Sequence, residues 1–515
     1  MTARDDTPTP RSSRTTCAIA GGGPAGLVLG LLLARAGVDV TVLEKHADFL
    51  RDFRGDTVHP TTMGLLDDLG LFDRFDTLPQ SHVKGVKLPG PDGADVLITD
   101  FTRLPLRHPY IAMVPQWDLL DLIAEAASAE PSFTLLTEHE VTGVVQEGDR
   151  VAGIDYTSPD GEGRLLADLT VACDGRWSAV RRAVGLPSKE IPVDFDIWWY
   201  RVPTARHIGE SLFPRTAKGR AAIVIPREGY LQIAQIGRKG TDAQIRARGI
   251  EAFRAEVAEL LSDVAGDQSG IKSMDDVKHL DVRVDRLRRW HAAGVLCIGD
   301  AAHAMSPVGG VGINLAVQDA VATARLVAGP LLRGEFSRPA GDRILARVHR
   351  RRVVPTVVIQ SLQRVMHSRV IMPALDGKTV RLGRRVSRTV ERLPFLTIVP
   401  AFVVGVGPRP ERAPAWATSR AHPFRVRLGA PRGRIARDRP HAEQLGRAED
   451  QDAYRGFGVE LPGALKVRSS PNTSSTMAGM DRVSSSRIHC VKAMPNTVAP
   501  DSAAKLAAGS PIPRR

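Results

Sequence analysis

The chain opens with an apolar run, an apolar helical stretch and a second apolar run. Cys17 to Ala20 and Val38 to Leu43 have the length and composition of buried strands, and Leu27 to Ala36, between them, has that of a helix. A strand, a helix and a strand joined this closely form a βαβ unit, in which the two strands are parallel. The pattern therefore predicts a parallel sheet covered by helices.

The same type of pattern continues to about residue 186, with two helical stretches and four strand-like runs. They are Thr61 to Leu71, Gln116 to Ala127, Phe133 to Leu136, Val141 to Val145, Val151 to Tyr156 and Leu166 to Ala172. The polar passage Pro89 to Gly93 is typical of a turn between strands.

From about Pro187 the pattern changes to alternating strands. Ala221 to Ile225 and Tyr230 to Ile236 are separated by the turn-rich Pro226 to Gly229, which predicts a hairpin. The apolar strand Val295 to Ile298, followed by a long helix after residue 313, then returns to the first type of pattern. The chain is therefore expected to leave its first domain, build a second one and come back.

Glycines occupy the turn between the first strand and the first helix. Gly21, Gly23 and Gly26 form G-x-G-x-x-G, whose bare backbone lets a pyrophosphate approach the N-terminus of a helix. Glu44 closes the second strand, 23 positions after Gly21, where a carboxylate can accept hydrogen bonds from the ribose hydroxyls of an adenosine. The strand, helix, strand and acid in this order predict a Rossmann-like site for a dinucleotide, but they do not distinguish FAD from NAD.

Two later segments decide between these cofactors. Cys173 to Arg181 contains the pair Asp174-Gly175 after an apolar strand, although Asp174 and Ser178 could also be helix caps. Gly299 to Asn314 places Asp300 at the end of a strand and ends in glycine-rich sequence at the start of a helix. The carboxylate can accept hydrogen bonds from a polyol, and the helix start offers N–H groups to an electron-accepting ring.

In this order and spacing the three motifs resemble the para-hydroxybenzoate hydroxylase family of FAD monooxygenases, over residues 16 to 408. The resemblance implies FAD and NAD(P)H as cofactors and one polypeptide for both reduction and oxygenation. Hydride from NAD(P)H would reduce the flavin, and dioxygen would add to it to form a C4a-hydroperoxide that transfers one oxygen.

The resemblance also implies roles for single residues. Gly21, Gly23 and Gly26 match the family's pyrophosphate loop, Glu44 matches its adenosine-ribose acid, and Arg54 matches the arginine that meets the FAD pyrophosphate.

Further matches lie near the polyol chain of the flavin and in the dual-cofactor motif. Gln116 looks like the glutamine near the polyol chain, and Asp300 matches the ribityl contact. Asp174 and Gly175 match the motif that the family ties to both FAD and NAD(P)H.

The last matches surround the flavin ring. Gly312 and Asn314 match the ring contact at a helix N-terminus, and Pro307 matches the proline beside the reactive face of the flavin, the one position with a catalytic assignment. His303 is expected to have a structural role.

These patterns together predict an α/β fold in which a Rossmann-like FAD-binding domain is interleaved with a β-sheet substrate domain and followed by C-terminal helices. The expected divisions are a disordered lead (1–15), the first part of the FAD-binding domain (16–186), the substrate domain (187–285), the return segment with C-terminal helices (286–410) and a basic, disordered tail (411–515).

Most of the positive net charge of the chain is expected to lie in the tail. Residues 411–515 carry a net +9 of the total +13, and residues after about Pro414 are expected to be dispensable. A solvated tail is favoured over nucleic-acid binding, so no nucleic-acid partner is expected.

The cysteines and the apolar segments point to a cytoplasmic protein without integral membrane association. Cys17, Cys173 and Cys297 lie in apolar runs without metal-like spacing, which is typical of reduced core thiols, and no metal site is expected. Leu393 to Val406 is apolar but broken by prolines, and a docked segment of the folded body is favoured over an interfacial anchor. A homodimer remains open.

The expected partners are dioxygen and an aromatic substrate, which would bind between the flavin and the sheet of residues 187–285. The strand Ala221 to Ile225 is wholly apolar, and the flanking Arg220 and Arg227 are expected to be solvated ends, which favours a larger, less charged ring system over a simple benzoate. Trp198 to Pro203 only half-resembles the W-x-W-x-I-P signature of flavin-dependent halogenases. A halogenase, an isoprenoid-type FAD reductase and a silent FAD-binding regulator remain as alternatives.

Overall fold

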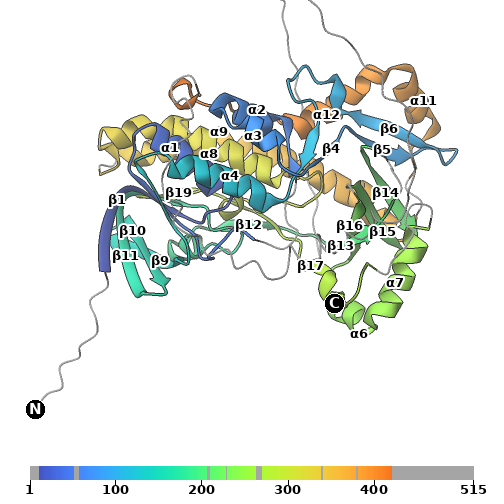
Figure 1. The fold of residues 1–515 in the computed structure, drawn as a ribbon, viewed down its shortest axis with the longest axis horizontal. Coiled ribbons are helices and arrows are strands. Elements are labelled where there is room, and N and C mark those ends of the chain that lie inside the picture. The colour runs from blue at the N-terminus through green and yellow to red at the C-terminus, as the bar shows by residue number, and fades with distance from the viewer. Residues whose placement is uncertain are drawn as a thin grey trace, which may run out of the picture. The chain divides into compact units, whose positions relative to one another are not determined.

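The computed structural model describes residues 11–50, 57–205, 209–217, 219–227, 229–262, 270–337, 340–378 and 381–419 (Figure 1). All of them belong to the first of two compact units, Met1–Leu428. The second unit, Gly429–Arg515, which contains most of the expected tail, lies outside the described residues.

The first sheet is built on the predicted βαβ unit. Its central strands lie in the order β20, β11, β1, β2 and β8, each parallel to its neighbour. Their bounds are Val295–Cys297, Gly161–Ala172, Arg11–Ala20, Val40–Leu43 and Phe133–Leu136. Three antiparallel strands complete the described sheet: β19 (His291–Ala292), β10 (Arg150–Ser158) and β9 (Glu140–Glu147).

Helices α1 (Pro24–Arg35), α4 (Gln116–Ser128) and α8 (Gly312–Leu332) lie over one face of this sheet (Figure 1). α1 is buried along nearly all of its length because it packs against the sheet, α4 and α8. Among the described helices α8 alone is long and apolar enough to cross a membrane, but 72% of its apolar stretch is buried in the protein, as in a core helix.

The second sheet contains seven strands within the described residues, in the order β17, β13, β16, β15, β14, β5 and β6. Their bounds are Lys278–Leu280, Phe195–Pro203, Tyr230–Arg238, Arg220–Pro226, Ser211–Ala217, Gly85–Pro89 and Asp95–Asp100. The predicted hairpin is β15–β16. The assignment of all of residues 16–186 to the first domain was wrong, since β5 pairs with β14 and carries β6 into the second sheet.

Strand alternation gives the second sheet two different buried faces. Trp198, Tyr200 and Val224 pack with Phe253 on α7 (Gly249–Leu260), and the Trp198 indole N–H donates to Asp242 Oδ1 at 2.8 Å. The aromatic run after Phe195 is therefore a packed strand. Trp199 and Ile223 lie on the opposite face, whose core includes α10 (Met372–Leu375).

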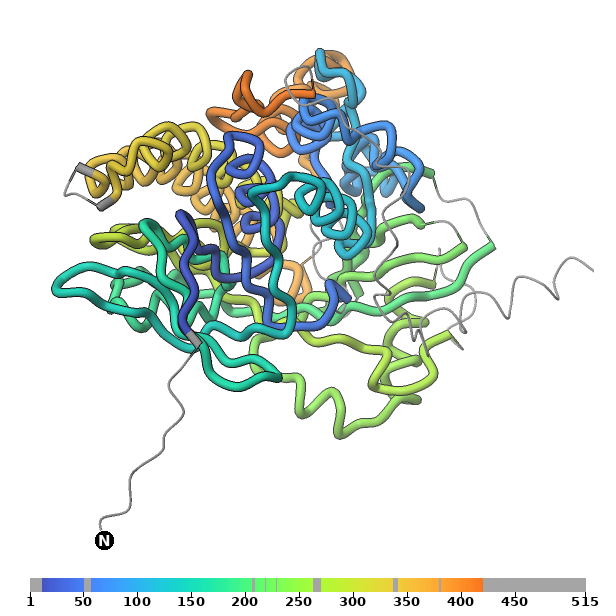
Figure 2. Tube along the Cα trace, turned by 60° about the vertical axis from the view of Figure 1, so that its left-hand side comes forward, coloured from blue at the N-terminus to red at the C-terminus, as the bar shows by residue number. Residues whose placement is uncertain are grey.

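The remaining described elements connect these layers. They are α2 (Pro60–Leu69), α3 (Phe72–Asp76), α5 (Ala179–Ala183), α6 (Asp242–Ala247), α9 (Ala340–Met366), a π-helical turn (His367–Ile371), α11 (Arg384–Arg392), α12 (Ile398–Gly405), β3 (Thr57–Val58), β4 (Ser81–Val83), β7 (Ile111–Met113), β12 (Ser188–Ile191), β18 (Val284–Leu287) and the short 3₁₀ turns Phe101–Arg103, Met274–Asp276, Gly299–Ala301, Glu335–Ser337, Pro394–Thr397 and Ala415–Ala417. Figure 2 shows the yellow C-terminal helices returning beside the blue helices of the first domain.

Both ends of the folded body extend further than the composition predicted. Residues 11–15, assigned to a disordered lead, belong to β1, because they pair with Gly163 to Ala167 on β11. Residues 411–419, assigned to the tail, are packed as well. Glu411 accepts two hydrogen bonds from Arg351, at 2.6 and 2.8 Å, and the buried Arg35 donates to the Ala417 carbonyl at 2.9 Å.

The described cysteines agree with the expected core thiols. Cys17 and Cys297 are buried, Cys173 is half-buried, and none of the three forms a disulfide. Burial raises the pKa of all three thiols, so they are poor nucleophiles at neutral pH. No group of three potential metal ligands occurs within the described part of the chain.

These contacts move the boundary of the dispensable tail from Pro414 to Ser419. A chain ending at Ser419 should keep a free energy of unfolding within about 0.5 kcal/mol of the full chain. A chain ending at Pro410 removes one acceptor of the buried Arg35 and should lose at least about 1–3 kcal/mol. Urea unfolding of the three proteins measures both differences, and equal stability of the two shortened chains would contradict this boundary.

Candidate active site

The predicted motifs meet at one edge of the first sheet. The glycine loop follows β1, Asp174 follows β11, Asp300 follows β20 and Glu44 follows β2. These four strands are consecutive and parallel, so their carboxyl ends share an edge. Such an edge is where open α/β sheets bind their ligands.

The glycine loop lies against the backbone of the neighbouring strand. A Cβ at Gly26 would lie 2.0 Å from the Gly21 carbonyl oxygen, and Gly21 has φ +101°, so both positions require glycine. A Cβ at Gly23 would meet nothing within 4 Å. Gly23 also directly precedes α1, so open space adjoins the N-terminus of a buried helix.

Glu44 is buried beside this loop. Its Oε2 accepts a hydrogen bond from the Gly22 N–H at 3.0 Å, and its Oε1 accepts one from the His46 N–H at 3.1 Å. Each carboxylate oxygen can accept more than one hydrogen bond, so these contacts orient Glu44 without excluding ribose hydroxyls.

The surroundings of Asp174 are consistent with both a helix cap and a ligand contact. Its Oδ2 accepts a hydrogen bond from the Val180 N–H at 3.3 Å, and Ser178 caps α5 by accepting from the Arg181 N–H at 2.9 Å, so part of the capping interpretation holds. Asp174 Oδ1, however, is buried and has no hydrogen-bond partner among the described residues. Burial raises the pKa of Asp174, and its backbone adjoins Gly21. A buried acceptor left over beside the glycine loop fits a bound ligand.

Arg176 connects the Asp174 motif with the Asp300 motif. Its guanidinium lies 4.0 Å from Asp300 Oδ2 and donates to the Asp281 carbonyl at 3.2 Å. Asp300 is partly exposed, as a residue that meets a polar ligand would be.

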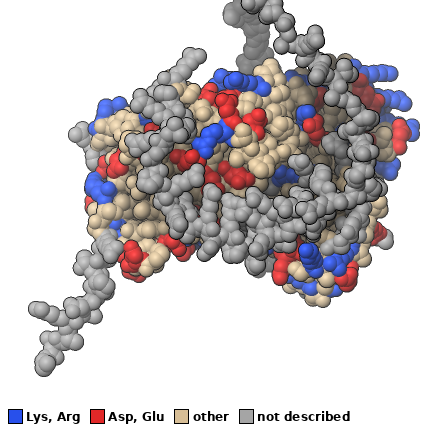
Figure 3. All heavy atoms as spheres, in the orientation of Figure 1, with Lys and Arg blue, Asp and Glu red and all other residues tan. Residues whose placement is uncertain are grey.

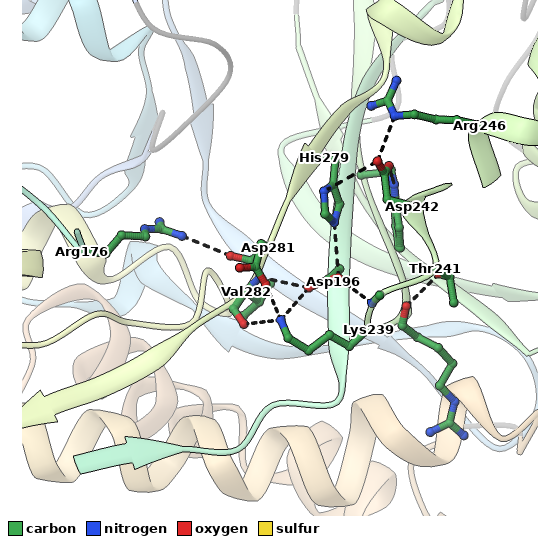
Figure 4. A network of polar contacts seen from close by, with 12 residues as sticks. Arg176, Asp196, Lys239, Thr241, Asp242, Arg246, His279, Asp281 and Val282 are labelled. Atoms are coloured by element: carbon green, nitrogen blue, oxygen red, sulfur yellow. Dashed lines mark hydrogen bonds and ion pairs between the residues drawn. The ribbon is translucent and has the colours of Figure 1, made fainter. Parts of the chain in front are cut away.

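A polar network continues from Asp281 into the second sheet (Figure 4). Lys239 Nζ donates to Asp281, to the Val282 carbonyl and to the buried Asp196, at 2.5, 2.8 and 2.9 Å. Burial acts to raise the pKa of Asp196, but hydrogen bonds from Gly240, Lys239 and Val282 outweigh it and hold the pKa below its usual value. The network ties the Asp174 segment to the end of β13.

Asp319 on α8 holds the turn that carries Asp300. Its Oδ2 contacts His303 Nε2 at 2.6 Å and the Gly299 N–H at 3.2 Å, and its Oδ1 accepts from Arg352 at 2.8 Å. All three side chains are at most 1% exposed. Burial acts to raise the pKa of Asp319, but His303 and Arg352 outweigh it and lower the pKa. His303 therefore lies in a buried structural network, away from solvent.

The start of α8 presents backbone rather than side chain to the strand edge. The Asn314 side-chain oxygen accepts from the hydroxyls of Thr61 and Thr62, at 2.7 and 2.8 Å, which ties Asn314 to α2. Gly312 is the first residue of the helix. A ring contact at this point would therefore use N–H groups, with the positive end of the helix dipole.

Helix α9 fixes the loop that contains Pro307. Gln360 donates to the Asp285 and Ala304 carbonyls, at 2.8 and 3.2 Å, and Gln363 donates to the Ser306 and Val308 carbonyls, at 2.8 and 2.9 Å.

One turn further along, His367 Nε2 lies 2.9 Å from Ser306 Oγ. Pro307 is half-buried and closes a turn with Gly310, and Val308 packs on the Trp199 and Ile223 face of the second sheet. The loop thus lies between the strand edge and the second sheet.

Two expected cofactor residues add little to this geometry. Gln116 is half-buried at the first position of α4, and Arg54 lies outside the described residues.

The expectation for Arg220 and Arg227 was wrong, since both are partly buried and paired. Arg227 donates to Gln232 Oε1 at 2.9 Å and also to the Met113 carbonyl, and Arg220 pairs with Glu256 at 3.1 Å. Sequence position at a strand end did not reveal these partners on distant elements.

Four functional residues escaped the sequence analysis: Asp319, Arg352, Gln360 and Gln363. Each lies in a helix where a polar residue usually faces solvent, and here each faces the core. Their only sequence signal was polar residues at the inward positions of an otherwise apolar helical pattern.

Fold and site together define a dinucleotide-binding α/β protein, and the open space at Gly23 and the unpaired Asp174 oxygen fit a bound dinucleotide. A family described as "FAD binding domain" matches residues 14–360. The chain belongs to this family, which confirms the predicted cofactor and fold class.

Individual relatives are monooxygenases. The chain is 34% identical to 6-methylpretetramide 4-monooxygenase of Streptomyces rimosus over 348 residues, covering 65% of this chain and 80% of that protein. It is 32% identical to 12-dehydrotetracycline 5-monooxygenase/anhydrotetracycline 6-monooxygenase of Streptomyces rimosus subsp. rimosus, covering 59% of this chain and 60% of that protein, which is less than two thirds of its length.

Among solved structures, the anhydrotetracycline hydroxylase OxyS of Streptomyces rimosus superposes with a TM-score of 0.61 at 23% identity, covering 76% of each chain. At this identity the likeness shows the fold alone.

Replacing Asp319 tests the buried network. Asp319→Asn removes the closest charged partner of the buried Arg352, since Glu411 Oε1 lies 3.9 Å away, and should lower the free energy of unfolding by about 3–5 kcal/mol. The control Glu125→Gln breaks an exposed pair with Arg74 and should cost at most about 1 kcal/mol. Urea unfolding measures both, and a similar loss in the two variants would refute the role of Asp319.

Proposed function

We propose that this chain is an FAD-dependent monooxygenase that uses NAD(P)H and dioxygen to hydroxylate an aromatic, polycyclic substrate. The observation that carries the proposal is the meeting of the Gly21, Asp174 and Asp300 segments at one sheet edge, opposite an apolar face of the second sheet. The monooxygenase relatives support the same reaction class.

The strand-edge residues would hold FAD. Gly21, Gly23 and Gly26 would place its pyrophosphate at the N-terminus of α1, Glu44 would bind the adenosine ribose, and Asp300 would bind the ribityl chain. When bound, FAD supplies the redox chemistry, since it accepts hydride from NAD(P)H and activates dioxygen.

Other residues would complete the site. Gly312 and Asn314 would offer backbone N–H groups to the flavin ring, and Pro307 would border its reactive face. Gln116 would lie near the polyol chain of the flavin, and Arg54 would contact the pyrophosphate.

Asp174 and Gly175 would serve both FAD and NAD(P)H. Because the proposed reaction needs NAD(P)H, we expect it to take place in the cytoplasm.

The substrate would bind against the Trp199 and Ile223 face of the second sheet. This face is apolar, and the two arginines that flank β15 already have protein partners, so neither is available for a small aromatic carboxylate. A ring system larger and less charged than a benzoate fits this surface. The relatives that are named as pretetramide and tetracycline monooxygenases support a large ring system of that type.

The Asp300 assignment predicts weaker FAD binding on substitution. A charge-assisted hydrogen bond contributes about 1.5–3 kcal/mol, and ~1.4 kcal/mol is one decade in affinity. Asp300→Ala should therefore raise the FAD dissociation constant at least about tenfold, as measured by flavin fluorescence. Asp376→Ala, which removes an exposed carboxylate paired with Arg238, should leave it unchanged. An unchanged constant in folded Asp300→Ala would exclude the role.

The reaction class is tested by turnover with labelled dioxygen. Purified protein with FAD, NAD(P)H and a panel of polycyclic phenols should give a product that gains one labelled oxygen, without an added reductase or halide. NAD(P)H oxidation should be much slower without substrate.

Three other results would reassign the protein. A halogenated product would indicate a halogenase, a product saturated without oxygen would indicate a reductase, and FAD binding without NAD(P)H oxidation for any compound would indicate a regulator.

A further inference from the structure

Exposed large apolar side chains are concentrated on one part of the described surface. Ten of the thirteen such residues lie between positions 354 and 402. We call nine of them the apolar surface: Val354, Val357, Val358, Leu362 and Val365 on α9, and Leu393, Phe395, Val399 and Phe402 on and just before α12. A group of exposed large apolar side chains of this kind indicates an interaction site.

The pattern of α9 shows why this surface is unusual. In its second half the inward positions hold polar residues such as Gln360 and Gln363, whereas valines and a leucine point outward. In the first half the outward positions hold Arg343, Arg347 and Arg350. A helix on the surface of a soluble protein normally has apolar residues on its inward face and polar residues on its outward face along its whole length.

The two rows of the apolar surface lie on neighbouring helices. Val403 and Val404 of α12 pack against a buried cluster that includes Ile359 of α9. α12 is docked on its other side against Phe101 and Leu104, so Leu393 to Val406 is a docked segment, as expected, but the described residues cover only one of its faces.

Arginines border the apolar surface. Arg364 and Arg369 end the α9 row, and Arg384, Arg385, Arg388 and Arg392 line α11, next to Leu393. All six are exposed, and within the described residues none forms an ion pair. Figure 3 shows lysine and arginine atoms gathered where Figure 1 places α11. Acids on the adjoining β6 have their own partners, since Asp95 pairs with Arg215 and Asp100 with Arg103.

The charge of the folded body is strongly divided. Residues 343–410 hold 14 Lys and Arg against 2 Asp and Glu, a net +12, whereas residues 1–342 hold 38 against 46, a net −8. The high pI is therefore not a property of the tail alone.

This charge decides between the possible occupants of the apolar surface. In a two-fold dimer the surface would face its own copy, which would bring arginine-rich borders together. Residues 420–515 carry a net +9 and would be repelled in the same way. An anionic lipid bilayer offers both an apolar layer and negative headgroups.

We propose that the apolar surface and its arginine border bind the interface of an anionic membrane, with Phe395 and Phe402 entering the acyl boundary and the arginines of α11 contacting headgroups. The protein would then be peripheral, not membrane-spanning.

Vesicle sedimentation with the full chain tests this. Binding to phosphatidylcholine vesicles that contain about a third phosphatidylglycerol should be at least tenfold tighter than to phosphatidylcholine alone, and should weaken at high salt. Phe395→Ser with Phe402→Ser, and separately Arg384→Glu with Arg388→Glu, should each reduce it at least about tenfold. Arg288→Glu with Arg289→Glu, the same charge change at two exposed arginines elsewhere, should reduce it much less.

Two results would overturn the proposal. Equal binding by all four proteins would assign lipid affinity to the basic tail. A dimer in light scattering that Phe395→Ser with Phe402→Ser converts to a monomer, together with no vesicle binding, would assign the surface to a second copy. Unchanged FAD content in the variants shows that they are folded, so the outcome is independent of the proposed monooxygenase activity.

Discussion

The arrangement of the site depends on one buried carboxylate, Asp319. This residue of α8 contacts groups from two other parts of the chain: the turn after β20, through Gly299 and His303, and α9, through Arg352. A buried charge is stable only while its partners remain in place, because each lost partner leaves an uncompensated group in a medium of low dielectric. Arg352 also donates to the Arg409 carbonyl at 3.2 Å, which includes the C-terminal segment in the same network. The Asp300 turn therefore cannot shift without moving α8, α9 and the end of the folded body.

The polar contacts that helix α9 makes in the site also determine the character of its exposed surface. Its inward face supplies Arg352 to Asp319, and Gln360 and Gln363 to the loop around Pro307. A polar inward face leaves less apolar area to stabilise the helix from within. Apolar side chains on its outward face restore apolar burial only if a further layer covers them. The polar contacts that position the flavin side of the site and the exposed apolar surface of α9 are thus two consequences of the same inverted pattern.

The sequence was sufficient wherever the structure is local. The predicted strand Cys17 to Ala20, the glycine loop and Glu44 lie within thirty residues of one another along the chain. The two strands of the βαβ unit, β1 and β2, are also neighbours in the sheet. Prediction failed where partners are distant: β5 joins β14 across more than a hundred residues, residues 11–15 extend β1 only because β11 is long enough to pair with them, and Arg227 meets Met113 on β7. Composition likewise misplaced the start of the tail, since Glu411 and Trp416 are held by contacts that a Pro- and Arg-rich pattern does not reveal.

The same difference between local and distant contacts explains why the sequence specifies the cofactor but not the substrate. A dinucleotide is held largely by backbone N–H groups and by carboxylates at strand ends, and both are specified by short motifs that persist in a family. The proposed substrate would lie against the Trp199 and Ile223 face, where it would meet side chains from several strands and from the loop at Val308, which no motif joins. Two chains with the same glycine loop can therefore share FAD and differ in every contact to the ring that they oxidise. Under the proposed function, the ring is selected on this face of the second sheet, whereas the strand edge would hold the cofactor in the same way for different rings.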